Sequence, residues 1–165
     1  MEFGPQQLAL VDLLTLSPGE IGWVIGTSPK LILRVTSENS ADTGFFFVEL
    51  NASEPTQLKR IGNLNVGEYS VLKVPGSWKV EVREPIAIAS DLAHARIALS
   101  EQAAFLCLNY ASVTGSGTYF LNLTTFAFSS EYPYGQRGAI SAWKIVLVDG
   151  DKRTDLAAIG DWAGA

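Results

Sequence analysis

The residues that could carry out acid–base or nucleophilic chemistry are few and far apart. His94 is the single histidine and Cys107 the single cysteine. A catalytic histidine needs a nucleophile and an orienting group within reach, and no motif in this sequence supplies them. The stretch "TGSGT" (114–118) lacks the strand–Ser–helix context of a nucleophile elbow and the lysine of a phosphate-binding loop, and it is predicted as a glycine-rich hairpin loop. We therefore predict a protein that is not an enzyme and has no cofactor, with Cys107 as a buried apolar residue.

The strongest metal candidates are the carboxylates of "VDGDKRTD", namely Asp149, Asp151 and Asp155. A calcium site needs about six to eight oxygen ligands, whereas Asp-Gly before a charged stretch is typical of a hairpin turn. One histidine and one cysteine cannot make a zinc ligand set. The sequence favours a turn here and predicts no metal site.

An aromatic loop, "SSEYPYGQRGA" (129–139), is the best candidate for binding a ligand. Tyr132 and Tyr134 flank a proline, and Gln136 and Arg137 follow closely. Rings beside planar hydrogen-bonding groups can stack on a glycan or anchor a protein interface. The alternative is that the tyrosines pack on their own sheet.

Composition excludes several classes of partner. The formal charge is -5 and only 18% of residues are charged, so the clustered lysine and arginine that nucleic acid requires are missing. No run approaches the roughly 18 apolar residues of a membrane helix. The N-terminal "MEFGPQQLALVDLLTLSPGE" has an acidic second residue and is interrupted by Asp12, so we expect no signal peptide, and assembly in a cytoplasm.

Alternating apolar residues predict an all-β fold, an antiparallel β-sandwich with turns at sandwich-like spacing. The predicted strands are 22–26, 30–36, 45–50, 66–74 and 76–82, the last two forming a pair around a turn at Pro75-Gly76. The segment 90–108 is either a helix capped by Ser90 or two strands with a turn at Ser100. We favour the strands because Ala95, Ile97 and Leu99 alternate with His94, Arg96 and Ala98.

The second half of the chain repeats the order of the first. A shift that aligns Leu31 with Ala104 places "LILRV" on "AFLCL" and "GFFFVEL" on "GTYFLNL", and a slightly shorter shift places Trp78-Lys79 on Trp143-Lys144. Any two strand patterns align apolar on apolar, so this is either an internal duplication or the common pleat. We divide the chain into an N-terminal arm (1–18), a first β-half (19–88) and a second β-half with a C-terminal tail (89–165).

The two ends of the chain are candidates for contacts with other subunits. Leu8, Val11 and Leu14 lie in the arm, and Trp162 lies in the tail. Apolar arms and anchored tails tie subunits into an oligomer or a lattice. Either end could instead cover the chain's own core.

The stretch "GNLNVGEYSVLKVPGSWKVEV" (62–82), with Gly67, Tyr69, Gly76 and Trp78, resembles a strand pair of small β-sandwich structural proteins of tailed bacteriophages, such as capsid decoration or cement proteins. The likeness covers about a fifth of the chain. It implies a virion protein assembled in the host cytoplasm as a symmetric homo-oligomer, with other capsid subunits as partners and neither nucleic acid nor membrane. The alternative function is a carbohydrate-binding module that uses the loop at Tyr132.

Overall fold

The computed structural model describes residues 9–51, 56–61, 70–82, 96–112, 115–133, 135 and 138–159. These residues form strands and one short 3-10 helix, η1, so the predicted all-β class is confirmed. The first half holds β1 (Ala9–Asp12), η1 (Leu13–Thr15), β2 (Ile21–Val24), β3 (Lys30–Ser37), β4 (Phe45–Glu49), β5 (Gln57–Ile61), β6 (Ser70–Lys73) and β7 (Ser77–Val82). The second half holds β8 (Ile97–Leu99), β9 (Ala104–Ser112), β10 (Gly115–Asn122), β11 (Ala127–Ser129), β12 (Gly138–Ile140), β13 (Trp143–Asp149) and β14 (Lys152–Ile159).

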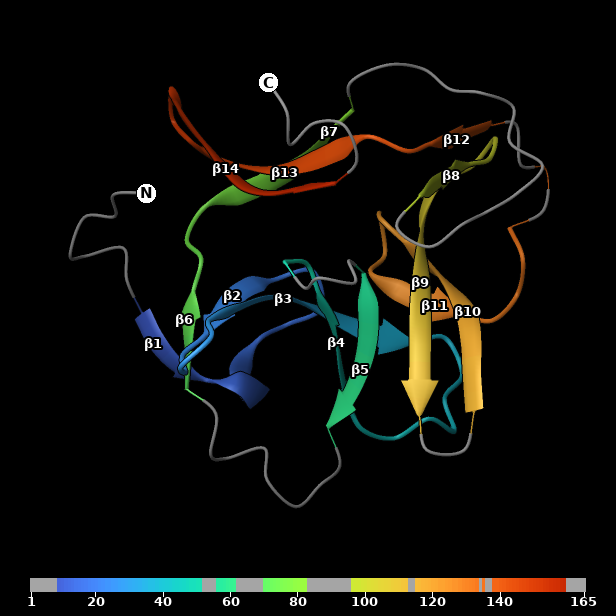
Figure 1. Ribbon diagram of the computed structural model, residues 1–165, viewed down its shortest axis with the longest axis horizontal. Helices are drawn as coiled ribbons and strands as arrows, with labels where there is room; N and C mark the ends of the chain where they lie inside the picture. Colours follow the sequence, from blue (N-terminus) through green and yellow to red (C-terminus); the bar gives the residue numbers. More distant parts are fainter. Residues whose placement is uncertain are drawn as a thin grey trace.

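Six strands close into a ring in the order β3, β4, β5, β9, β10 and β11, with β11 pairing back to β3 (Figure 1). The two joins between the halves, β5 with β9 and β11 with β3, are parallel, and the remaining pairs of the ring are antiparallel. A closed ring leaves none of its strands with an unpaired edge. The β-barrel therefore contains strands of both halves.

This ring differs from the antiparallel sandwich expected from the sequence. Alternation tells which side of a strand is buried, and that pattern is the same in a barrel and a sandwich. The two parallel joins decide between them, and each links a strand of the first half to a strand of the second half. Such long-range pairings leave no local signal in a strand pattern.

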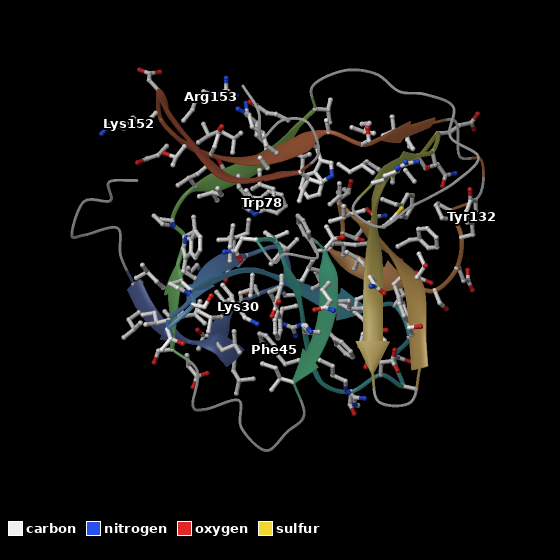
Figure 2. All side chains as sticks on the ribbon, viewed as in Figure 1. Lys30, Phe45, Trp78, Tyr132, Lys152 and Arg153 are labelled. Carbon is white, nitrogen blue, oxygen red and sulfur yellow. The ribbon has the colours of Figure 1, made fainter. Side chains whose placement is uncertain are left out.

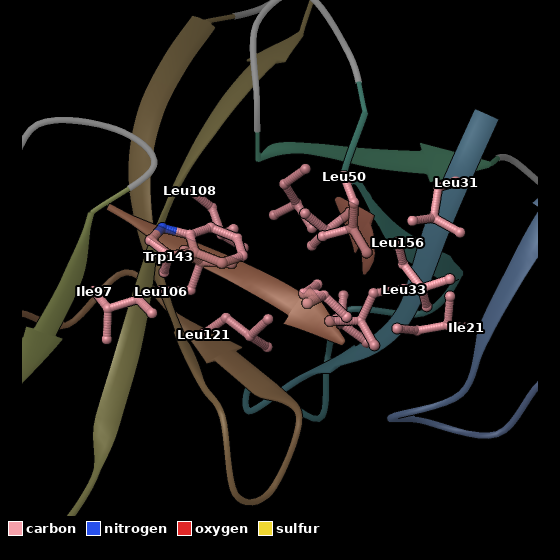
Figure 3. Close-up of a cluster of buried hydrophobic side chains, with 14 of the residues drawn as sticks. Ile21, Leu31, Leu33, Leu50, Ile97, Leu106, Leu108, Leu121, Trp143 and Leu156 are labelled. Carbon is pink, nitrogen blue, oxygen red and sulfur yellow. The ribbon is translucent and has the colours of Figure 1, made fainter. Parts of the chain in front are cut away.

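A three-stranded sheet, in the order β14, β13 and β7, lies across one end of the barrel (Figure 1). Its inner face contributes Trp143, Ile145, Leu147 and Leu156 to the cluster of buried leucines inside the barrel (Figure 3). The barrel and the sheet therefore share one core.

The predicted strand pair around Pro75-Gly76 is wrong. β6 pairs with β1 and β2, whereas β7 pairs with β13 in the other sheet. The chain crosses from one sheet to the other at Pro75-Gly76, where Gly76 has a φ of 85° that favours glycine. A Pro-Gly turn marks a change of direction but does not say which strand follows as a partner.

The register of the barrel repeats between the two halves. Ile32 of β3 pairs with Glu49 of β4. Under the shift that aligns Leu31 with Ala104, their counterparts are Phe105 and Asn122, which pair with each other in β9 and β10. The pairs of β3 with β4 and of β9 with β10 thus have the same register at the shift found in the sequence.

The parallel joins repeat as well. Gln57 of β5 pairs with Asn109 of β9, and Ala127 of β11 pairs with Thr36 of β3. Thr36 and Asn109 correspond under the same shift, and their partners Ala127 and Gln57 correspond under a shift three residues shorter, so the two joins are closely similar positions seen from opposite halves. An approximate twofold relation between the halves accounts for both.

Three further local predictions concern the segment 90–108, the Asp-Gly turn and the glycine-rich stretch 114–118. Within 90–108 the described part forms β8 and β9, and the backbone N–H of Ser100 bonds to the carbonyl of Ala103 at the turn between them, which confirms two strands. Asp149 pairs with Lys152 across a hairpin turn, as predicted. The stretch 115–118, expected as a loop, is instead the start of β10.

The described part of the N-terminal arm does not project from the molecule. β1 pairs antiparallel with β6, and Leu13 and Leu16 are buried against the outer wall of the barrel with Phe45 and Val71. This segment therefore covers the outer wall of the barrel of its own chain, which was the alternative left open by the sequence.

Candidate functional site

Exposed apolar side chains of β1, of η1 and of the residue that follows β2 form the candidate interaction surface, which we call the β1 surface. Leu10, Leu14 and Ile25 are 61%, 55% and 58% exposed, respectively. Their segments are neighbours, because Ser70 pairs with Asp12 on one side and accepts a hydrogen bond from the backbone N–H of Ile25 on the other. Side chains of this kind are usually buried, so three on adjacent segments indicate a contact surface.

Strand pairing extends the β1 surface inward. Leu10 is directly opposite Leu72 of β6, which is in turn opposite Trp23 of β2. Directly paired residues point to the same face of a sheet, so these three side chains form one apolar row. The row starts at the edge strand and leads toward the barrel core, against which Trp23 packs.

A groove of about 380 Å³ adjoins the β1 surface and shares Ile25 with it. Its apolar walls come from η1, from the β2–β3 hairpin and from the outer faces of β4 and β5. The apolar lining residues are Leu13, Val24, Ile25, Ile32, Phe47 and Ile61. An apolar side chain of a partner would find hydrocarbon on several sides of this groove.

One ion pair lies in the wall of the groove. Lys30 Nζ is 2.7 Å from Glu49 Oε1, and the Glu49 side chain is only 8% exposed while that of Lys30 is 52% exposed. A buried carboxylate requires a compensating charge, which Lys30 supplies. The pair is the main polar feature of an otherwise apolar depression.

The half-buried Arg34 contacts the same outer wall of the barrel. The Arg34 guanidinium lies 4.0 Å from the centre of the Phe45 ring and donates hydrogen bonds to the carbonyls of Val35 and, at 2.9 Å, Phe46. Burial lowers the pKa of Arg34 from its ordinary value. The contact is a cation–π interaction within the chain, which single-sequence reasoning could not locate.

The sequence-predicted interface residues divide into two groups. Leu14 is exposed and belongs to the β1 surface, whereas Val11 packs against the buried cluster of Leu13 and Val71. Leu8 and Trp162 lie outside the described residues. Leu10 and Ile25 were missed because a strand pattern assigns one face to the core without saying where the sheet runs past it.

The aromatic loop is only partly described. Tyr132 is half-exposed and lies edge-on against Phe120 on the outer wall of the barrel, with ring centres 5.5 Å apart (Figure 2). Tyr134, Gln136 and Arg137 lie outside the described residues. The structure therefore brings Tyr132 onto its own sheet, and the predicted platform of four side chains remains a prediction.

The candidates for chemistry occupy structural positions where they are described. Cys107 is fully buried with Ala98 and Phe120, and burial raises the pKa of its thiol to about 11. The carboxylates near Asp149 lie at the β13–β14 hairpin, and no three His, Cys, Asp or Glu side chains within the described ranges gather closely enough for a metal ion. His94 lies outside the described residues.

A cleft of about 690 Å³ lies between β7 and the adjacent end of the barrel, with Trp78 and Ala104 in its wall. The Trp78 side chain is labelled in Figure 2. Trp78 Nε1 donates a hydrogen bond to the carbonyl of Gly19 at 2.8 Å, and its ring lies 5.5 Å from that of Phe126. An ion pair between Lys73 and Glu20 lies on the rim. The two contacts of Trp78 join the three-stranded sheet to the segments that lead into β2 and β11.

Comparisons with known proteins found no match: neither a family model, nor a curated protein, nor a solved structure resembles this chain closely enough to be reported. Within the part of the chain that the structure describes, no helix has the length and apolar character needed to cross a membrane. The class that the fold defines is an all-β protein with a six-stranded barrel and a three-stranded sheet.

Proposed function

We propose that this protein is a non-enzymatic structural protein that attaches to a larger protein assembly. The observation that supports this function is the β1 surface, where Leu10, Leu14 and Ile25 are exposed on adjacent segments. Removing such side chains from water favours association by about 25 cal/mol per Å² of apolar area, before the costs of binding are subtracted. Strand pairing of β1 with β6 and of β6 with β2 holds these segments in place without a partner, so little ordering cost is expected.

The same surface favours a homo-oligomer. β1 is the last strand of its sheet, and among the described strands its outer edge has no partner. An exposed edge presents backbone N–H and C=O groups that can pair with another strand. If β1 of two copies paired antiparallel around Leu10, the row of Leu10 and Leu72 would continue into the second copy.

The assembly that we propose is a virion, in which the chain decorates or cements the capsid after assembly in the host cytoplasm. This more specific proposal depends on the resemblance of 62–82 to phage structural proteins. The β1 surface supports a protein partner in general, and capsid subunits are the partners that the resemblance implies. We also propose that the two β-halves arose by internal duplication, because their strand registers repeat.

The native mass of the purified protein tests the oligomer. We expect the wild-type chain to form a discrete oligomer at micromolar concentration, and Leu10→Lys to raise its dissociation constant by about tenfold or more, since a buried charge replaces an apolar contact. The matched control is Val82→Lys. Val82 is also exposed, by 49%, but lies on β7, away from β1.

A wild-type monomer at about 100 μM, or equal losses in Leu10→Lys and Val82→Lys, would contradict a β1 interface. Mass spectrometry of purified virus particles whose genome encodes this chain tests the virion proposal separately. Stoichiometric presence of the chain in the particles is expected, and its absence from them would overturn the virion assignment.

A further inference from the structure

The end of the barrel away from the three-stranded sheet contains two adjoining hollows that the β1 surface does not use. The larger measures about 540 Å³ and the smaller about 140 Å³. They share Asp42, Tyr119 and Phe128 in their walls, so they form one continuous depression, which we call the barrel mouth. At the other end of the barrel, Ala104 and Leu123 line the cleft that contains Trp78 of the three-stranded sheet. The barrel mouth is therefore at the end opposite the sheet.

Four aromatic rings line or support the barrel mouth. The ring centre of Phe128 lies 5.0 Å from that of Phe46 and 5.6 Å from that of Tyr119, and Tyr110 lies 5.8 Å from Tyr119. All three contacts are edge-to-face, the favourable arrangement for aromatic pairs. Tyr119 is half-buried, so its ring is fixed by neighbours while part of it faces the hollow. A fixed ring loses little entropy when a ligand packs on it.

Hydrogen-bonding groups of both kinds surround these rings. Carboxylates of Glu38, Asp42 and Glu131 line the mouth and can accept hydrogen bonds. Asp42 Oδ2 is positioned by the Ser37 hydroxyl, which donates to it at 2.8 Å. The hydroxyls of Ser129 and Ser130 and the amide of Asn39 complete the rim of the larger hollow.

Arg60 supplies donors on the side of the smaller hollow. Its guanidinium donates to the carbonyl of Thr43 at 2.5 Å and lies 5.7 Å from the centre of the Phe46 ring. The planar group is thus held beside Asp42 and Tyr119, which line the same hollow. Its remaining N–H groups can donate to a ligand.

We propose that the barrel mouth binds a neutral sugar residue. An anionic ligand would meet the carboxylates of Glu38, Asp42 and Glu131, and a cationic ligand would meet the Arg60 guanidinium. A neutral polyol satisfies acceptors and donors together, and the C–H face of its ring packs on Tyr119. The volume lies within the roughly 300–1,000 Å³ typical of small-molecule sites, and mouths of β-barrels are frequent places for them.

This inference is independent of the assembly function, and it moves the glycan site expected from the sequence. Tyr132 packs outside the barrel on Phe120, whereas Glu131 of the same loop lines the mouth. Tyr119 and Tyr132 therefore make a matched pair for an experiment, because both are tyrosines with edge-on aromatic contacts and only Tyr119 lines the mouth.

The test is to titrate the full chain with D-glucose, D-galactose, D-mannose and N-acetyl-D-glucosamine, each at up to about 20 mM. Calorimetry and saturation-transfer NMR measure the binding. We expect at least one sugar to bind with a millimolar or lower dissociation constant. Tyr119→Ala and Asp42→Ala should each weaken that binding by about tenfold, and Tyr132→Ala should leave it within about twofold.

Asp42→Ala keeps the experiment decisive if Tyr119→Ala lowers stability, because Asp42 is exposed and its substitution leaves the core intact. Failure of all four sugars to bind would overturn the proposal. So would equal loss of binding in Tyr132→Ala and Asp42→Ala. Binding of spermidine that Asp42→Ala abolishes, with no sugar bound, would assign the mouth to a cationic ligand instead and also overturn it.

Discussion

Trp78 and Trp143 occupy corresponding positions on two strands that pair with each other. Trp78 of β7 is opposite Leu147 of β13, and Trp143 of β13 is opposite Val82 of β7. Under the shift that aligns the two tryptophans, Trp78 corresponds to Trp143 and Val82 corresponds to Leu147, so the two pairs are equivalent. The pair of Val80 with Ile145 lies midway between them. The Trp-Lys motif that recurs in the sequence therefore marks the place where the two halves meet.

The two tryptophans differ in burial, and this predicts different effects of truncation. Trp143 is 1% exposed within the shared core, whereas Trp78 is partly buried beside the cleft. We expect Trp143→Ala to lower the free energy of unfolding by about 3–5 kcal/mol through lost burial and a cavity. Trp78→Ala should cost less, since it loses a hydrogen bond and one ring contact in a place that water already reaches.

Urea denaturation of the two variants measures this difference, with Trp143→Phe as the control that keeps an aromatic side chain. Trp143→Phe should fall between the wild type and Trp143→Ala. Equal destabilisation by Trp78→Ala and Trp143→Ala would contradict the different burial of the two tryptophan side chains.

Burial of Cys107 predicts a thiol that is unreactive in the folded protein. Burial raises the pKa of Cys107 from its ordinary value of 9.0 to about 11, so little thiolate exists at pH 8. We expect slow reaction with a disulfide reagent in buffer and rapid reaction in urea, where the same single thiol is exposed. Fast labelling of the folded chain would contradict the position of Cys107 behind Phe120 and Ala98.

The same shift of the pKa predicts a change of stability at high pH. The unfolded chain loses the thiol proton near pH 9 and the folded chain only near pH 11, so this contribution is complete below about pH 9. It is lost as the pH rises toward 11. Cys107→Ala should have a shallower loss of unfolding free energy over that range than the wild type, measured by urea denaturation at several pH values.

The ion pair of Lys30 with Glu49 predicts unequal effects of its two partners. Lys30→Met leaves a buried carboxylate without its neighbouring cation and should destabilise by about 1–2 kcal/mol, less than the 3–5 kcal/mol of a fully buried pair because Lys30 is half-exposed. Lys30→Met combined with Glu49→Leu should recover part of the loss, since both charges are then absent from an apolar groove.

A double-mutant cycle by urea denaturation isolates the interaction between the two side chains. The control is Lys152→Met, which removes an exposed lysine in the β13–β14 hairpin and should change stability by less than about 0.5 kcal/mol. Unchanged stability in Lys30→Met would show that Glu49 does not depend on this partner.

Particular elements show which parts of the fold could be predicted from the sequence. The β2–β3 hairpin, the strand at Phe45, the turn at Ser100 and the Asp-Gly hairpin were predicted because their partners lie next to them in the chain. β6 and β7 were paired wrongly, because each binds a strand distant in sequence. Of the candidate sites, the sequence found Leu14 but missed Leu10 and Tyr119, whose roles depend on the exposed edge of β1 and on the barrel mouth.

The sequence by itself determined the all-β class, the residues on each face of most strands, and the shift that relates β3 to β9. These follow from side-chain alternation and turn residues, which are local properties. Only the tertiary structure decided that the halves interlock in one barrel, that β7 and β13 leave it for a second sheet, and which apolar side chains stay exposed. Those outcomes depend on pairings between distant strands, and the free energy of such pairings comes from burial shared by both partners rather than from either segment alone.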